Sequence, residues 1–174
     1  DAQTAAQKKD FKTALADAQK AMTRAGRTEF DTYKINQFLT FIDATLGDIP
    51  GAAAAAEAAA DSPAMPDSDK ITVTHTALVL ALNLQHFDKA AQYAKTLQDA
   101  NAPMDAATTA SVIQAYYLGG KLDEAKAMAQ KAVDATPAGQ RPDHNILQIL
   151  MSVEAQQKDE ANAEKTLEML AVDY

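Results

Sequence analysis

Apolar positions recur at helical spacing through most of this chain. In the stretches 33–47 and 71–85 the apolar residues lie near i, i+3, i+4 and i+7, which places them on one face of an α-helix. A third stretch, 144–156, allows two registers, one through Leu147 and one through Ile146. Few β-branched runs and no Asn-Gly or Asp-Gly hairpin turn compete with this interpretation. The pattern therefore predicts helices throughout.

A small residue recurs at the start of every second predicted helix. In each case an alanine follows a short turn and an acidic residue, and the successive spacings are 38, 38, 35 and 38 residues. A small side chain there lets two antiparallel helices approach closely. A single helix pair cannot bury its apolar face alone and must stack on its neighbours. The alanines are Ala14, Ala52, Ala90, Ala125 and Ala163.

The repeat predicts the architecture. Breaker-rich segments at 61–69, 101–103 and 136–143 separate the helix pairs, and only a stub precedes Ala14. We expect an all-α fold, a right-handed α-solenoid of about five antiparallel helix pairs whose first pair is incomplete. It should form one domain over 1–174, truncated at both ends. The expected units are 1–28, 29–66, 67–103, 104–141 and 142–174.

One unit resembles a known repeat family. Residues 109–137 are similar to a tetratricopeptide repeat (TPR), which ends its first helix with an aromatic residue and carries glycine in the turn, small residues in the second helix and then proline. The usual tryptophan is absent, and Asp43 stands where a buried aromatic residue is usual, which allows a shift of that unit by one residue. The matching residues are Tyr116, Gly119, Gly120, Ala125, Ala132 and Pro137.

More narrowly, the chain resembles a group of secreted bacterial TPR proteins. The similarity runs through "GRTEFDTYKINQFLTF", "ASVIQAYYLGGKLDEA", "RPDHNILQILMSVEAQQKDEA" and "LEMLAVDY". Members of that group usually carry an N-terminal secretion signal and continue past a Tyr-Pro at the last helix. The resemblance implies a location in the periplasm or cell envelope of a bacterium, with a cytoplasmic location left open.

Composition and charge restrict the partners. The net charge of −8 argues against a nucleic-acid partner, because such a protein needs a basic stripe to displace counterions. The charge is uneven, since residues 1–27 hold six Lys or Arg against three Asp. No apolar stretch is long enough for membrane insertion. The absence of cysteine excludes disulfides and thiolate metal ligands.

Motifs for catalysis are missing. The three histidines do not share metal-ligand spacing with one another or with a carboxylate pair, and no Gly-x-Ser-x-Gly elbow occurs. The "LGGK" at 118–121 lacks the glycine spacing and the Ser or Thr of a phosphate loop. We therefore expect no catalytic residue, no metal ligand and no cofactor.

The first helices of stacked pairs line a concave surface that solenoids use for binding. Aligning the units on their alanines predicts an amide-rich, nearly uncharged groove with aromatic points at Phe41 and Tyr117. Amides can bond an extended peptide backbone through both donors and acceptors. The predicted groove residues are Lys34, Gln37, Phe41, Thr72, His75, Val79, Asn83, Ser111, Gln114, Tyr117, Asn145, Gln148 and Ser152.

The sequence thus predicts a non-enzymatic scaffold or adaptor that binds a protein or an extended peptide. A TPR subgroup grips acidic chain ends with groove Lys, Asn and Arg, but only Lys34 and Asn83 fit that pattern here. One alternative is a self-associating structural module of the bacterial envelope. A second alternative is a small-molecule receptor or enzyme accessory domain, which would need a deep pocket.

Overall fold

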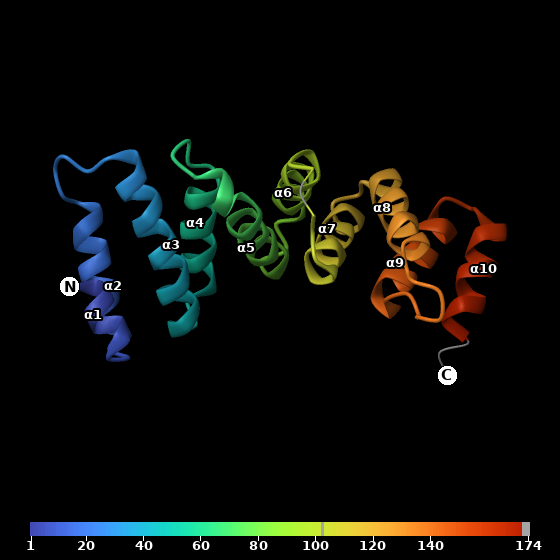
Figure 1. Ribbon diagram of the computed structural model, residues 1–174, viewed down its shortest axis with the longest axis horizontal. Helices are drawn as coiled ribbons and strands as arrows, with labels where there is room; N and C mark the ends of the chain where they lie inside the picture. Colours follow the sequence, from blue (N-terminus) through green and yellow to red (C-terminus); the bar gives the residue numbers. More distant parts are fainter. Residues whose placement is uncertain (102, 172–174) are drawn as a thin grey trace. The chain divides into compact units, whose positions relative to one another are not determined.

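The computed structural model describes residues 1–101 and 103–171, and this part of the chain is helical without strands (Figure 1). It contains ten α-helices and one short 3-10 helix, and neighbouring helices pack together in pairs. The predicted all-α, TPR-like fold is confirmed. The chain divides into two compact units, Asp1–His86 and Phe87–Tyr174.

The N-terminal unit contains five helices and the 3-10 helix, and each helix packs on the next from α1 to α5. The first helix has six residues. The elements are α1 (Ala2–Gln7), α2 (Phe11–Met22), α3 (Glu29–Leu46), α4 (Ile49–Ala60), η1 (Asp67–Asp69) and α5 (Lys70–Asn83).

The C-terminal unit repeats the same arrangement. Its helices pack in sequence order, and α7 also contacts α9. The predicted repeat 67–103 contributes one helix to each unit, and the repeat boundaries stay a prediction. The helices are α6 (Phe87–Asp99), α7 (Ala106–Leu118), α8 (Leu122–Asp134), α9 (His144–Gln156) and α10 (Glu160–Ala171).

The turns after the first helices all share the same backbone geometry. One residue there adopts a left-handed conformation, five positions before the repeat alanine. The next N–H donates to a carbonyl at the end of the first helix, as in Asp48 to Asp43 and Lys121 to Tyr116, which satisfies a terminal acceptor. The left-handed residues are Lys9, Gly47, Gln85, Gly120 and Lys158.

The repeat alanines are buried in four of the five units. Ala14, Ala52, Ala90 and Ala125 are each 0% exposed, as their small size predicts. Ala163 is half-buried. Aspartate at the helix starts satisfies free N–H groups: Asp10, Asp48, Asp105 and Asp143 each accept a hydrogen bond from the first turn of their helix.

In the last four units, the position nine residues before the repeat alanine is buried even where it is acidic. Asp43 is 8% exposed and Glu154 is 1% exposed, in the place that Tyr116 takes in the 104–141 unit. The suggested one-residue shift at 33–66 is therefore wrong. The Thr166 hydroxyl donates to Glu154 over 2.8 Å, which satisfies one acceptor of this buried carboxylate.

Candidate functional site

None of the predicted groove residues is buried. Those in the N-terminal unit lie on α3 and α5, and those in the C-terminal unit lie on α7 and α9. The half-buried ones are Gln37, His75, Val79, Ser111, Tyr117 and Ser152. The exposed ones are Lys34, Phe41, Thr72, Asn83, Gln114, Asn145 and Gln148.

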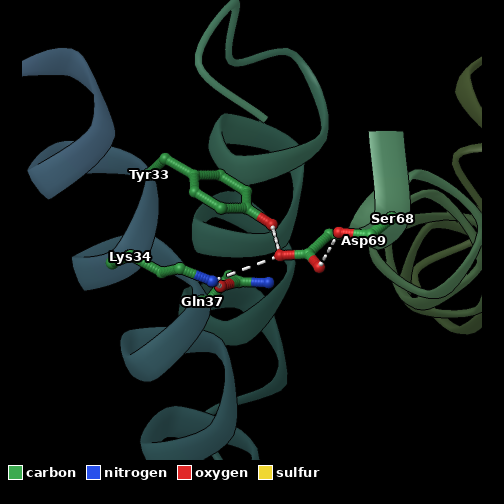
Figure 2. Close-up of polar contacts among 5 residues, drawn as sticks. All are labelled: Tyr33, Lys34, Gln37, Ser68 and Asp69. Atoms are coloured by element: carbon green, nitrogen blue, oxygen red, sulfur yellow. Dashed lines mark hydrogen bonds and ion pairs between the residues drawn. The ribbon is translucent and has the colours of Figure 1, made fainter. Parts of the chain in front are cut away.

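A polar cluster joins α3 to the segment before α5. Figure 2 shows the Tyr33 hydroxyl and the Lys34 amine converging on the Asp69 carboxylate, at 2.6 Å and 3.2 Å. Lys34 also donates to Gln37 over 2.9 Å, and the Ser68 hydroxyl donates to Asp69 over 3.1 Å. The cluster fixes two predicted groove residues, Lys34 and Gln37, against each other.

The groups around Asp69 stabilise its negative charge. Hydrogen bonds from Tyr33, Lys34 and Ser68 lower the pKa of Asp69, because they favour its charged form. Burial, with the nearby Asp69, raises the pKa of Tyr33 above its usual range. The Lys34 amine lies 4.9 Å from the centre of the Tyr33 ring and 5.6 Å from that of Phe30, within the range of a cation–π contact. Lys34 is therefore a positioned cation.

Two hollows flank α3. The larger has a volume of about 460 Å³ and lies toward α1 and α2, where Ile35 and Phe38 line it. The smaller, about 120 Å³, lies toward α4 and α5. Lys34 lines the first hollow and Gln37 lines the second. Their mutual hydrogen bond therefore stands between the two hollows, on the face of α3 that carries the predicted groove residues.

The smaller hollow brings predicted and unpredicted residues together. Gln37 and Thr72 were predicted, whereas Thr40 and Thr76 were not. The Thr40 and Thr76 hydroxyls donate to carbonyls of their own helices over 2.9 Å. Each therefore keeps its lone pairs as acceptors. The apolar part of the lining is Ala56, Ala59 and Val73.

In the C-terminal unit, a hydrogen bond spans two first helices. The Gln156 amide on α9 donates to the Tyr117 hydroxyl on α7 over 3.1 Å. Ser111 and Ser152 donate their hydroxyl hydrogens to Ala107 and Gln148 of their own helices. Tyr117 is thus the predicted residue here that bridges neighbouring first helices, and Gln156 is a partner that the sequence did not reveal.

Adjacent Tyr116 points about 100° away from Tyr117 around α7. It is 3% exposed and donates to the Gln98 side chain on α6 over 2.7 Å. Burial, with the acidic side chains of Glu124 and Asp99, raises the pKa of Tyr116 to about 12. Tyr116 is therefore a core residue, and Tyr117 stands at the surface, as the predicted groove register requires.

The described residues offer no group of three or more His, Cys, Asp or Glu placed to hold a metal ion. Within the same part of the chain, no helix has the length and apolar character needed to cross a bilayer. A third hollow, about 480 Å³, lies among α6, the end of α7 and the start of α8. Its charges balance, with Asp88 and Glu124 against Lys95 and Lys121.

The geometry defines a TPR-like helical repeat. No protein-family model matches the sequence, and no curated protein matches it. Solved structures with similar folds include two of MamA, a TPR-like protein. "MamA RS-1 ArsTM double mutant" is 17% identical with a TM-score of 0.65, over 98% of this chain and 88% of that chain. MamA 41-end from Desulfovibrio magneticus RS-1 is 16% identical with a TM-score of 0.64, over 98% and 89%.

A third similar structure is BtubC (BKLC) from P. vanneervenii. It is 19% identical with a TM-score of 0.59, over 98% of this chain and 75% of that chain. At these identities the likeness establishes the fold, and the chemistry of the surface must be argued from the residues of this chain.

Proposed function

We propose that this protein is a non-enzymatic scaffold that binds a protein or an extended peptide along the first helices of its pairs. The pair of hollows on either side of α3 carries this proposal. A peptide laid across α3 can place side chains in both hollows, while its backbone meets the Gln37 amide. Amide side chains offer a donor and an acceptor to such a backbone, and aromatic anchors tend to dominate binding energy.

The experiment is a selection from a phage-displayed library of random linear peptides, followed by affinity measurements on the selected peptide. Gln37→Ala should lower the affinity for that peptide at least about fivefold, which corresponds to about 1 kcal/mol of binding free energy. Gln19→Ala is the matched control, because Gln19 is an exposed glutamine on the second helix α2. If the library yields no binding peptide, or if both substitutions lower the affinity equally, the proposed binding along the groove is contradicted.

A self-associating module is the second candidate, since TPR-like folds fit both partner binding and self-association. Exposed Leu167 on α10, at 54%, and Phe30 on α3, at 48%, are apolar points that a second copy could cover. Sedimentation velocity over a range of concentrations separates this reading from a monomeric scaffold. The resemblance to secreted bacterial proteins supports a place in the periplasm or envelope, which fractionation of the source cells would test.

A further inference from the structure

The larger hollow beside α3 has an apolar floor and a cationic rim. Its floor comes from the last turns of α2 and the first turns of α3, and its rim comes mainly from the loop that joins them. A volume of about 460 Å³ falls within the range of ligand pockets. The floor residues are Ala18, Ala21, Ile35 and Phe38, and the rim residues are Arg24, Arg27 and Lys34.

The rim has an excess of positive charge. Asp31 is the acidic residue of the lining, and its carboxylate already accepts the Thr28 N–H at 2.9 Å and the Thr28 hydroxyl at 2.7 Å. Lys34 is already paired with Asp69 at 3.2 Å, so Arg24 and Arg27 face one carboxylate that caps a helix. This local excess stands out in a chain with a net charge of −8, and it favours an anionic ligand.

The two arginines present free donors, and hydrogen bonds hold Arg27 in place. Arg27 donates through Nε to Thr32 at 2.9 Å and through Nη1 to the carbonyls of Met22 and Arg24. These bonds hold the guanidinium and leave its Nη2 without a hydrogen bond among the described residues. The Arg24 side chain makes no hydrogen bond or ion pair within the same residues. A planar carboxylate matches such donors.

We propose that this pocket binds an acidic side chain of an extended peptide and seats a neighbouring apolar side chain on its floor. The inference rests on the proposed function and names the class of partner. A small inorganic anion would leave Ile35 and Phe38 uncovered. A peptide covers them and continues past Lys34 toward Gln37 and the second hollow. The arginines lie in the α2–α3 loop, outside the predicted groove positions.

The test compares two peptides labelled with an uncharged BODIPY dye, Gly-Leu-Glu-Phe-Glu-Leu-Gly and its counterpart with glutamine in place of glutamate. Fluorescence polarisation with the full chain should show tighter binding of the glutamate peptide. Arg24→Gln should weaken that peptide about fivefold, as the loss of one exposed charge pair does, and should leave the glutamine peptide unaffected. The unfolding temperature should not change, because Arg24 is exposed.

Lys20→Gln is the matched control, because it removes the same charge from an exposed residue on α2 outside the pocket. It should leave binding of the glutamate peptide unchanged. An equal loss with Lys20→Gln would show a general effect of charge and overturn the proposal. Arg24-dependent binding to phosphatidylglycerol vesicles, without peptide binding, would also overturn it in favour of a lipid surface.

Two further results separate this inference from the proposed function. If both peptides bind equally and Gln37→Ala weakens both, the groove stands and its acidic preference is wrong. If neither peptide binds, the acidic preference is wrong as well, and the library selection decides on the groove independently.

Discussion

The two adjacent tyrosines of α7 allow a direct test of the helix register in the C-terminal unit. Tyr116 is 3% exposed and bonded to Gln98, whereas Tyr117 is half-buried and bonded to Gln156. Consecutive residues point about 100° apart around a helix. Removal of the two rings should therefore affect different properties of the protein.

The structure sets the sizes of the two effects. Tyr116→Ala should lower the free energy of unfolding by about 3–5 kcal/mol, as loss of a large buried ring does. Tyr116→Phe removes the bond to Gln98 alone and should cost about 1 kcal/mol. Tyr117→Ala removes a partly exposed ring with one exposed hydrogen bond, and its cost to stability should stay near or below about 1 kcal/mol.

Urea denaturation followed by circular dichroism measures these differences, and polarisation with a library-selected peptide measures binding. Tyr117→Ala should weaken binding by about 2 kcal/mol, the scale of an aromatic hot spot, while Tyr117→Phe tests the hydroxyl alone. A reversal, in which Tyr117→Ala unfolds the protein and Tyr116→Ala does not, would refute the register. Unchanged binding with Tyr117→Ala would refute only its role in the groove.

Three further substitutions test the backbone of the turns and the buried Asp43. Burial, with the charge of Asp48, raises the pKa of Asp43, so its ionisation reduces stability as pH rises through that pKa. Asp43→Asn should therefore raise the unfolding temperature at neutral pH, with no gain below about pH 4; a gain that is the same at both pH values would contradict this. Lys158→Gly should stabilise by about 0.5–1 kcal/mol in denaturant titrations, because Lys158 is left-handed, while Gly120→Ala should destabilise by about 1 kcal/mol. Destabilisation by Lys158→Gly would contradict the turn geometry.

The fold was predictable because its frame depends on small residues at fixed places. Ala14, Ala52, Ala90 and Ala125 are fully buried, so their spacing marked one buried position in each of these helix pairs. The turns were harder to recognise. Glycine marks the left-handed position at Gly120. Lys9 and Lys158 take the same conformation, but lysine has no intrinsic preference for it, so the residue type does not predict it.

The hollows were not predictable from periodicity. Ile35 and Phe38 belong to the apolar pattern of the stretch 33–47, yet both are only half-buried and line the larger hollow. Periodicity identifies the face of a helix and does not reveal how fully its neighbour covers that face. Here α2 presents Ala18 and Ala21, which are too small to fill the space opposite the larger side chains.

The arginines were missed for a different reason. The basic excess in residues 1–27 was visible, but Arg24 and Arg27 lie in the loop between α2 and α3, where no helical period applies. The placement of the Arg27 side chain depends on its bonds to the carbonyls of Met22 and Arg24. Such bonds follow from the path of the loop, which the sequence pattern does not specify.

The buried polar residues specify which helices pack against each other, which the buried alanines cannot do. Helices that meet through alanine have similar surfaces, so pairing in a wrong order would lose little packing. Glu154 bonds to Thr166 on α10, and Tyr116 bonds to Gln98 on α6. A helix paired with the wrong neighbour would bury these groups without a partner, which costs about 1–3 kcal/mol for each and more for a charged group. The alanines therefore permit close packing, and the polar pairs select which helices pack together.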